Sequence, residues 1–535
     1  MKDRMEDIQL QDVMGSQGTC TGVLHTDVVI IGNGPSGICL SYLLSGNWPY
    51  VNNHPHPNPF LERKLRENSD CSILQQDLQY LSEGLEGRSN NPVALLMDTL
   101  CHPNADLGMD EPSCLQWNHH PARNIPHVVL GRGPPGGAWQ DMDGSMLTLS
   151  LGNWMELPQM DFRQWAQHHR SERKRTCMRC GQTHCISLTR SQHGGVNCAR
   201  QDRAYISDVA QYYSDYVKHM GLEKNFLVGS TVTSVRRLVV DCAFINQESG
   251  EQEASCQLHR PECCRKNMWE VRGVLQADDL QQPFCYHAPH VVMATGTTDI
   301  PNRLDFKGDN DNDVVVHDLR EIEKAIANKE LDEHSDPVMV VGAGLTAADA
   351  ILCLRSRKIP IVHVFRRDVK DQGLIFKTLP DGLYPEYHTV YQMMKSKDGY
   401  PGYKSYPRHE ILEMRAGRKC VLKGPVRRCL IGRMIDCPEK VVHVSKVLVL
   451  IGARPNLSFL GNNGMDLAVD STKQVSCKKN PIDVDPYTFE SARAQGLYAV
   501  GPLVGDNFVR FVKGGPLGIA SHLVKTMMDS DATMM

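Results

Sequence analysis

Two glycine-rich turns each follow an apolar run that predicts a buried strand. Gly32 to Gly37 (GNGPSG) comes after Val28 to Ile31, and Gly342 to Ala347 (GAGLTA) comes after Val338 to Val341. A strand, a G-x-G-x-x-G/A turn and a helix start present backbone N–H groups to a pyrophosphate, and only glycine lets the backbone approach that closely. Two such turns in this order predict a flavoprotein that binds FAD at Gly32, Gly34 and Gly37, and a nicotinamide cofactor at Gly342 and Gly344.

The residues after the second turn indicate which nicotinamide binds. An apolar helical pattern covers Ala347 to Leu354, and a second strand, Ile361 to Phe365, ends in Arg366 and Arg367. At that strand end an acid would accept hydrogen bonds from a ribose 2′-OH, whereas an arginine pairs with a 2′-phosphate. The two arginines therefore predict NADPH. The alternative is a solvated basic turn.

The first turn lacks the acid that usually holds the ribose of FAD. About 20 residues after Gly32, where that acid is expected, the chain reads Tyr50 to His54 (YVNNH), and the nearest carboxylate is Glu62. Three explanations stay open. Asn52 or Asn53 takes the role, Glu62 reaches the ribose from a displaced strand, or the flavin is held weakly.

Bulk properties limit the class of protein. The chain has 535 residues, a formal net charge of -4 and 41% hydrophobic residues, enough for two or three cores of ordinary size. The near-neutral charge gives no broad basic field, so we expect no nucleic-acid partner. Met1 to Asp7 lacks the apolar core of a signal peptide, and no apolar run approaches the roughly 20 residues that span a bilayer. We expect a cytoplasmic protein that is not transmembrane.

The cysteines favour free thiols over a disulfide framework. There are 19 of them in a long chain without an export signal, whereas disulfide frameworks belong to short secreted chains. One cluster lies in a basic stretch from 170 to 203: Cys177, Cys180, His184, Cys185 and Cys198. Its first pair has zinc-ligand spacing but lacks a second paired knuckle. We favour a loop with redox-accessible thiols and leave zinc open.

The patterns between the two turns predict the elements that position them. We expect disorder over residues 1–22, a helix over Ile38 to Leu44, a loop over Trp48 to Pro59, helical spacing over Leu61 to Leu85 and a polar stretch to Pro126. A strand over Val128 to Leu130 then leads into a tight Gly/Pro loop, Gly131 to Trp139.

Beyond that loop, Tyr205 to Met220 has helical spacing, and we expect its tyrosines to pack in the core. Strands are expected at Phe226–Val228, Val232–Val235, Leu238–Val240, Trp269–Val274, His290–Met293 and Gly496–Val500, with a helix from Gly514. Lone histidines such as His168, His169 and His363 are interpreted as solvated or packing residues.

The order of these pieces resembles the flavin-containing monooxygenases. Their Gly-Gly-x-Trp element corresponds to Gly136, Gly137 and Trp139, and their Ala-Thr-Gly-x4-Pro element to Ala294, Thr295, Gly296 and Pro301. Phe306, Gly308 and His317 match a Phe-x-Gly…His signature, although eight residues separate Gly308 from His317 where the monooxygenases have three. The Cys-rich segment departs from the pattern too, and looks like a lineage insertion.

The chain is more similar still to the oxidative stress-induced growth inhibitor family of animals. Long blocks carry this resemblance: Leu40–Gly46, Gln79–Arg88, Gly133–Trp139, Asn153–Pro158 and Gly501–Phe511. It implies an NADPH-dependent, monooxygenase-type flavoprotein tied to growth control, cell death and cell division under oxidative stress. It also implies that the protein is located in part at cell-division structures such as the midbody, and that it has regulatory protein partners.

The resemblance implies roles for particular residues. NADPH would reduce FAD, and the reduced flavin would use O2 to oxidise a small nucleophilic substrate. Gly136, Gly137 and Trp139 would form the wall beside the flavin. Thr295 and Gly296, at the crossing between the two domains, would also bind cofactor. Asn153 would hydrogen-bond the oxygen-bearing flavin, and its alternative role is a turn residue after Gly152. Gly501, Asp506 and Asn507 would meet the ribityl chain or ring.

The expected fold class is α/β, a two-dinucleotide-binding-domain flavoprotein with two Rossmann-like βαβ domains. The NADPH domain, 303–455, would be inserted between the two parts of the FAD domain, 23–302 and 456–535, whose first part carries loops at about 47–125 and 168–204. A second hypothesis is a catalytically weak cofactor-binding protein that regulates growth through protein partners. The missing ribose acid favours it.

Overall fold

The computed structural model describes residues 22–144, 146–169, 203–238, 268–277, 280–309, 313–380, 382–396, 400–425 and 439–534. The predictions for residues 1–21 and for the cysteine cluster at 177–198 lie outside the described residues. The chain forms two compact units. The first takes its described residues from Met1–Leu188, Ala204–Thr297 and Pro455–Met535, and the second takes them from Thr189–Arg203 and Thr298–Arg454.

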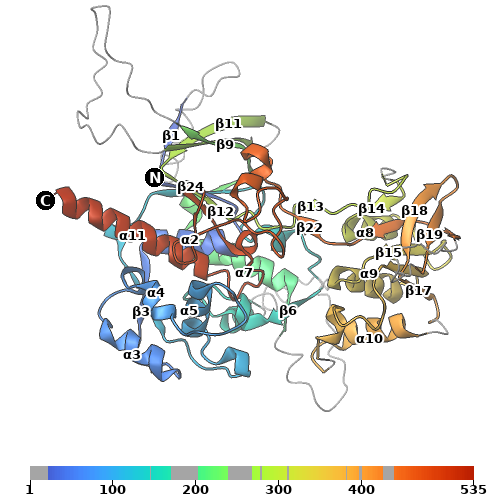
Figure 1. The fold of residues 1–535 in the computed structure, drawn as a ribbon, viewed down its shortest axis with the longest axis horizontal. Helices are drawn as coiled ribbons and strands as arrows, with labels where there is room; N and C mark the ends of the chain where they lie inside the picture. The colour runs from blue at the N-terminus through green and yellow to red at the C-terminus, as the bar shows by residue number, and fades with distance from the viewer. Residues whose placement is uncertain are drawn as a thin grey trace, which may run out of the picture. The chain divides into compact units, whose positions relative to one another are not determined.

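The first unit is organised around a six-stranded sheet (Figure 1). Its strands lie in the order β23 (Glu490–Ser491), β24 (Ala494–Ala499), β12 (His290–Met293), β2 (Val28–Ile31), β5 (His127–Gly131) and β8 (Phe226–Val228). All neighbours are parallel except β23 and β24. All four residues of β2 are buried, which is why its sequence is a continuous apolar run.

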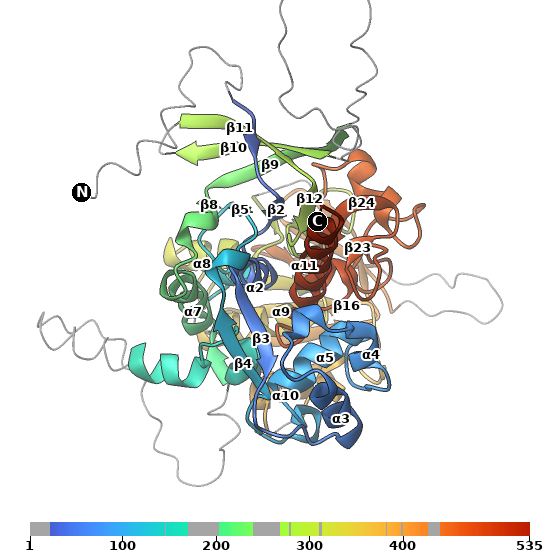
Figure 2. The same ribbon diagram turned by 90° about the vertical axis from the view of Figure 1, so that its left-hand side faces the viewer.

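Four helices pack around this sheet: α2 (Pro35–Leu44), α5 (Pro92–Cys101), α7 (Ile206–His219) and α11 (Gly514–Met534). Helix α11 packs against both α2 and α5 (Figure 2). The tyrosines of α7 are core residues, since Tyr212, Tyr213 and Tyr216 have no exposed surface, as the sequence predicts.

A folded insertion separates α2 from β5. It contains β3 (Asn47–Val51), α3 (Pro59–Glu67), η2 (Ile73–Gln75), α4 (Leu78–Ser82), α5, η3 (Ala105–Leu107), β4 (Leu115–His119) and η4 (Pro121–Arg123). Strands β3 and β4 form an antiparallel pair outside the main sheet. The loop predicted from Trp48 is therefore wrong as far as Val51, because Trp48 and Val51 are buried strand residues. The stretch before Pro126 is not featureless either, since it holds α5 and β4.

The rest of the first unit is a second sheet and several short elements. The sheet has the order β1 (Leu24–His25), β11 (Leu280–Ala288), β10 (Met268–Ala277) and β9 (Ser230–Leu238). Strand β11 has no counterpart in the sequence prediction, and the runs at 232–235 and 238 belong to one strand. The remaining elements are η5 (Gly137–Gln140), β6 (Leu147–Leu151), η6 (Gly152–Met155), β7 (Arg203–Tyr205), η8 (Glu223–Asn225), η11 (Gly461–Leu467) and η12 (Gly501–Val504).

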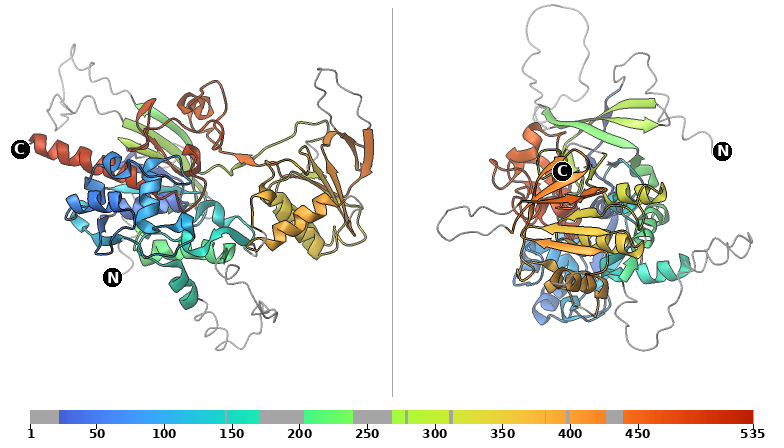
Figure 3. Two further views of the ribbon diagram at one scale, coloured as in Figure 1. Left: turned by 60° about the horizontal axis from the view of Figure 1, so that its bottom comes forward. Right: turned by 90° about the vertical axis from the view of Figure 1, so that its right-hand side faces the viewer.

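The second unit contains a five-stranded parallel sheet. Its order is β14 (Val315–Val316), β21 (Val447–Val449), β15 (Val338–Val341), β16 (Ile361–Phe365) and β17 (Tyr403–Pro407). Helices α9 (Leu345–Ser356) and α10 (Pro385–Lys395) pack against each other and on these strands (Figure 3). The unit also contains α8 (Leu319–Ala327), η10 (Ile375–Lys377), the antiparallel strands β18 (Glu410–Arg415), β19 (Lys419–Lys423) and β20 (Glu439–His443), and the pair β13 (Ile300–Pro301) and β22 (Ala453–Arg454).

Each unit thus contains its own strand, glycine turn and helix in an α/β arrangement.

In the described part of the chain, no helix has the length and apolar character that crossing a membrane requires.

Candidate cofactor-binding sites

The first glycine turn joins β2 to α2 at the carboxyl edge of the sheet. Gly32 has a φ of 113°, and a Cβ there would lie 2.3 Å from the carbonyl oxygen of Ala294. A Cβ on Gly37 would lie 2.1 Å from the carbonyl oxygen of Gly32. A Cβ on Gly34, by contrast, would lie no nearer than 4.0 Å to any other atom. Helix α2 begins here with neither a side-chain cap nor an acidic residue in its first turn, so its N–H groups can take an anion.

The Gly-Gly-x-Trp loop lies directly against this turn. The backbone N–H of Gly136 donates to the carbonyl of Asn33 at 2.8 Å, and the side-chain amide of Asn33 donates to the carbonyl of Gly133 at 2.7 Å. A Cβ on Gly137 would lie 3.1 Å from Cα of Gly34. The half-buried Trp139 packs against Tyr213, with ring centroids 6.3 Å apart. The structure therefore brings these two predicted segments together.

In the structure, the position of the missing ribose acid differs from the position about 20 residues after Gly32 that the sequence indicates. Strand β5, not β3, lies beside β2, so the second strand of the βαβ unit ends at Gly131. A Cβ on Gly131 would lie 2.1 Å from the side-chain amide nitrogen of Asn33, so an acid at this position would displace the Asn33 side chain. Asn52 bonds to the carbonyl of Ser113, and Glu62 bonds to Arg66.

Asn52 and Glu62 both belong to the insertion, so neither lies at the end of the second strand. A count backwards from Gly136 and Trp139, instead of forwards from Gly32, would have located this position.

Three more predicted residues lie at the same edge of the sheet. Thr295 follows β12, and Gly501 follows β24, where a Cβ would lie 2.9 Å from the hydroxyl oxygen of Ser36. Asp506 is buried, and its Oδ1 accepts a 2.7 Å hydrogen bond from Ser89. Among the described residues, neither Thr295 Oγ1 nor Asp506 Oδ2 has a hydrogen-bond partner, although both atoms are buried. Burial raises the pKa of Asp506 to about 6.

Buried polar atoms without partners are rare in folded proteins and call for a ligand or water. Thr295 and Asp506 therefore fit a polar ligand such as the ribityl chain of FAD. Asn507 does not fit as well, because it is exposed and its side chain donates to the carbonyl of Gly505 within its own loop.

Asn153 lies in η6, and the structure leaves both of its predicted roles open. Its side-chain nitrogen donates to Asp110 at 3.3 Å. Its Oδ1 is buried and has no partner among the described residues.

A buried charged cluster beside Trp154 was missed by sequence reasoning. Arg510 contacts both carboxylate oxygens of Asp98 at 2.5 Å and Asp106 at 2.9 Å. Its guanidinium carbon lies 4.7 Å from the ring of Trp154. The only available signal was the pair of cations, Arg510 and Lys513, in an otherwise apolar block.

Lys513 extends this cluster. Its Nζ lies 3.3 Å from Nε2 of His102, and it donates to the carbonyl of Glu156 at 3.5 Å. Burial raises the pKa of the Glu156 carboxyl to about 6. Burial, with Lys513 and Arg510 nearby, holds the pKa of His102 well below its usual value, so His102 is neutral.

The second glycine turn joins β15 to α9. Gly342 has a φ of 130°, and a Cβ there would lie 2.2 Å from the carbonyl oxygen of Leu450. Gly344 is the N-cap of α9, and a Cβ on it would have no atom within 4 Å. Helix α9 has no side-chain cap and no acidic residue in its first turn. Its N-terminus is therefore as open to an anion as that of α2.

The two predicted arginines lie at the same edge of this sheet, because β15 and β16 are parallel neighbours. They differ in their contacts. Arg367 donates to the carbonyl of Gly373 and lies 4.0 Å from Asp371. Arg366 is exposed and has no hydrogen bond or ion pair to another described residue. Arg366 is therefore the better candidate for a phosphate.

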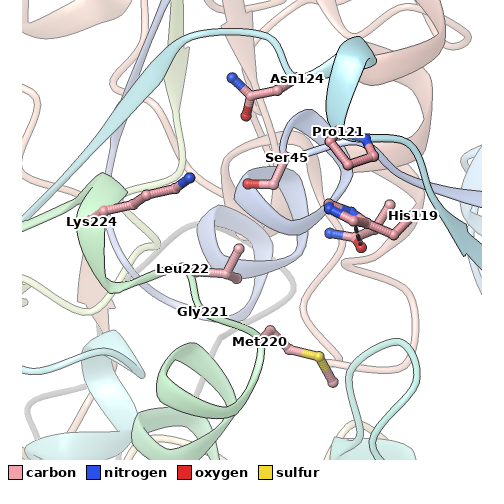
Figure 4. A pocket seen from close by; sticks show the side chains of 9 residues that line it. Ser45, His119, Pro121, Asn124, Met220, Gly221, Leu222 and Lys224 are labelled. Carbon is pink, nitrogen blue, oxygen red and sulfur yellow. Dashed lines mark hydrogen bonds between the residues drawn. The ribbon is translucent and has the colours of Figure 1, made fainter.

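One cavity lies in the first unit, away from its glycine turn. It has a volume of about 430 Å³ and is lined by Ser45, Asn47, His119, Pro121, Asn124, Met220, Gly221, Leu222 and Lys224 (Figure 4). It adjoins the C-terminus of α2, whose N-terminus is at the glycine turn. None of the predicted site residues lines it.

One group of possible metal ligands occurs among the described residues. Ligand atoms of Glu270, Cys285 and His287 lie within 4.8 Å of one another. Hydrogen bonds from Arg272 and Arg236 lower the pKa of Glu270 to about 2. These arginines already neutralise the only carboxylate of the group, so an ion-pair network explains it.

Comparison with known proteins identifies the family. No family model matches the chain. Oxidative stress-induced growth inhibitor 2 of Homo sapiens is 46% identical over 505 residues, which cover 93% of this chain and 92% of that protein. Oxidative stress-induced growth inhibitor 1 of Homo sapiens is 46% identical over 504 residues, which cover 93% and 95%. This chain belongs to the oxidative stress-induced growth inhibitor family.

Two solved structures of other proteins have a fold similar to that of this growth inhibitor family member. The bacillithiol disulfide reductase Bdr of Bacillus cereus has a TM-score of 0.51 and 13% identity, and the match covers 94% of this chain and 99% of that chain. The reductase of Staphylococcus aureus also has a TM-score of 0.51, with 11% identity over the same shares. At this level of identity, the likeness concerns the fold alone.

Proposed function

We propose that this member of the growth inhibitor family is an NADPH-dependent, FAD-containing monooxygenase. Its substrates would be O2 and a small nucleophilic molecule, and its activity would be linked to regulation of cell growth, cell death and cell division under oxidative stress. The observation that carries the proposal is the pair of open glycine turns, each at the start of a helix without a cap or an acid in its first turn.

The residues of the first unit suit FAD. The N–H groups at the start of α2 bind the pyrophosphate beside Gly34, where the backbone is open. Asp506 Oδ2 accepts a hydrogen bond from a ribityl hydroxyl, and Thr295 Oγ1 supplies a second polar contact. Gly136, Gly137 and Trp139 form a wall that excludes water, and the Asn153 amide is the candidate to hydrogen-bond oxygen. The chemistry that FAD supplies when bound is electron transfer from NADPH to O2.

The residues of the second unit suit NADPH. The N–H groups at the start of α9 bind its pyrophosphate beside Gly344, and Arg366 pairs with its 2′-phosphate. The arginine also accounts for selectivity, because NADH has only a hydroxyl where NADPH carries the phosphate that pairs with the arginine.

An anaerobic absorption experiment tests the cofactor assignment. We expect the purified protein to have a visible flavin band that bleaches with NADPH much faster than with NADH. Gly344→Asp places a carboxylate at the N-terminus of α9, so its flavin band should persist when NADPH is added. Ser356→Asp is the matched control, because it adds the same charge to α9 at the exposed end of the helix that is far from the turn. A protein without a flavin band, even after reconstitution with FAD, would contradict the proposal.

A second candidate is a catalytically weak cofactor-binding protein that regulates growth through protein partners. The observation that favours it is Gly131, which stands where the ribose acid is expected, with Asn33 filling the space. Stoichiometric FAD that NADPH reduces would count against this candidate.

A further inference from the structure

His363 is a buried polar residue at the centre of an apolar strand. It lies in β16 between Val362 and Val364, and none of its surface is exposed. Register pairs it with Val340 on β15 and Ser405 on β17. An unpaired imidazole in such a place would be strongly destabilising, so its two ring nitrogens need partners.

Both ring nitrogens have short hydrogen bonds. Nε2 lies 2.6 Å from the carbonyl oxygen of Gly342, and Nδ1 lies 2.7 Å from the hydroxyl of Tyr403. A carbonyl can only accept, so Nε2 carries the proton, and Nδ1 accepts from the tyrosine. Burial lowers the pKa of His363 to about 4. The ring is therefore neutral and held in one tautomer.

The bond to Gly342 determines how the glycine turn faces its ligand. In a planar trans peptide, the C=O and the following N–H point in opposite directions. His363 holds the Gly342 carbonyl toward the sheet, so the N–H of Ala343 points the other way. That N–H is one of the donors with which a G-x-G turn meets a pyrophosphate.

The first turn uses a different device. There the Cα of Gly37 lies against the Gly32 carbonyl, since a Cβ on Gly37 would be 2.1 Å from that oxygen. The second turn has Ala347 at the equivalent place, so its helix cannot approach in the same way. In the first unit, the residue of the neighbouring strand that corresponds to His363 is Val129. The side chain of Val129 has no hydrogen-bond donor.

We propose that His363 is a positioning residue of the NADPH site, which holds the Gly342 carbonyl and so directs the Ala343 N–H at the pyrophosphate. Tyr403 orients the imidazole. This inference rests on the proposed binding of NADPH to the second unit. It assigns His363 a role that a packing residue would not have.

The test is calorimetric titration of the FAD-loaded protein with NADP⁺ and with NAD⁺. Loss of one buried hydrogen bond corresponds to about a 10-fold change in affinity. We expect His363→Phe to lower the affinity for both ligands by about that factor, because both contain the pyrophosphate. Arg366→Ala should weaken NADP⁺ alone. Tyr403→Phe should give a smaller loss for both ligands, and His363→Gln, which keeps an N–H donor, should recover most of the affinity.

His127→Phe is the matched control. His127 is buried in the first unit, and its ring nitrogens bond to Ser41 at 2.8 Å and the carbonyl of Ile125 at 2.7 Å. Its loss should lower thermal stability without changing NADP⁺ affinity. Equal affinity for NADP⁺ in wild type and His363→Phe would overturn the inference. If His363→Phe fails to fold, equal affinity in wild type and Tyr403→Phe overturns it. Wild-type protein that binds no NADP⁺ would instead contradict the proposed function.

Discussion

Arg366 and Arg367 are adjacent in sequence but differ in what they can bind. The guanidinium of Arg367 is already engaged by the Gly373 carbonyl, whereas Arg366 is exposed at the strand end. The residue types alone predict a 2′-phosphate site, but only the side-chain contacts distinguish the two arginines.

The first prediction separates these arginines by cofactor kinetics. Arg366→Ala should raise the KM for NADPH about 10-fold or more and leave the KM for NADH unchanged, because a charge-assisted bond to the 2′-phosphate is lost. Arg367→Ala should have a smaller effect on NADPH. Steady-state NADPH and NADH oxidation measures both values. Equal effects of the two substitutions would show that the contacts of Arg367 do not matter.

The second prediction concerns Asp506, whose folded pKa is about 6 against an ordinary value of 3.8. The folded carboxyl keeps its proton to a higher pH than the unfolded one, so its ionisation opposes folding. In flavin-free protein its contribution to the free energy of unfolding should therefore fall as the pH rises from about 4 to about 6. Asp506→Asn should remove this fall and also weaken FAD binding.

Urea unfolding at pH 4 and pH 7, with fluorescence titration of FAD, tests both effects. Asn507→Ala is the control, since its side chain bonds only to its own loop among the described residues. A variant that binds FAD as tightly as wild type would remove Asp506 from the flavin site.

At the scale of elements, the contact between α5 and the segment just before α11 depends on buried charges. Arg510 and Asp98 are 412 positions apart in the chain, and their side chains are 3% and 6% exposed. No local sequence pattern connects residues at that separation, so the pair could not be predicted.

The third prediction is that Arg510→Ala destabilises the first unit by about 3–5 kcal/mol, because it leaves the Asp98 carboxylate buried without its partner. Arg510→Met combined with Asp98→Leu should recover much of that loss, since neither charge then remains. Chemical denaturation measures the change. A single variant that unfolds at the same denaturant concentration as wild type would refute this account of the contact.

The elements themselves were predictable where the backbone leaves few choices. Strands β2, β15 and β16 and both glycine turns follow from continuous apolar runs that end in glycine. The failures lie in the insertion, where Trp48 to Val51 resembles a loop by its Pro and Asn content but pairs with β4. The same insertion moves the second strand of the βαβ unit further along the chain, so a count of about 20 residues from Gly32 does not reach the position of the ribose acid.

At the scale of the whole molecule, two units with separate nucleotide turns should respond to their ligands separately. The fourth prediction is that FAD slows amide hydrogen exchange around residues 32–38 and 133–139, and NADP⁺ slows it around 342–348. Ligand binding suppresses local opening where contacts form. Exchange measured by mass spectrometry distinguishes these regions. Protection of the first turn by NADP⁺ alone would reverse the assignment of cofactors.

The pairing of β2 has a consequence for synthesis of the chain on the ribosome. Strand β12, the neighbour of β2, pairs in turn with β24 through Val291 and Leu497, so the first sheet needs residues from both ends of the chain. The described residues of Thr298–Arg454 form their own unit. Because sheets built from distant strands fold slowly, the inserted unit can fold while the exposed strands of the first unit still await β24 and α11. During that interval, the side of β12 that pairs with β24 stays open, and an unpaired strand edge can pair with another chain.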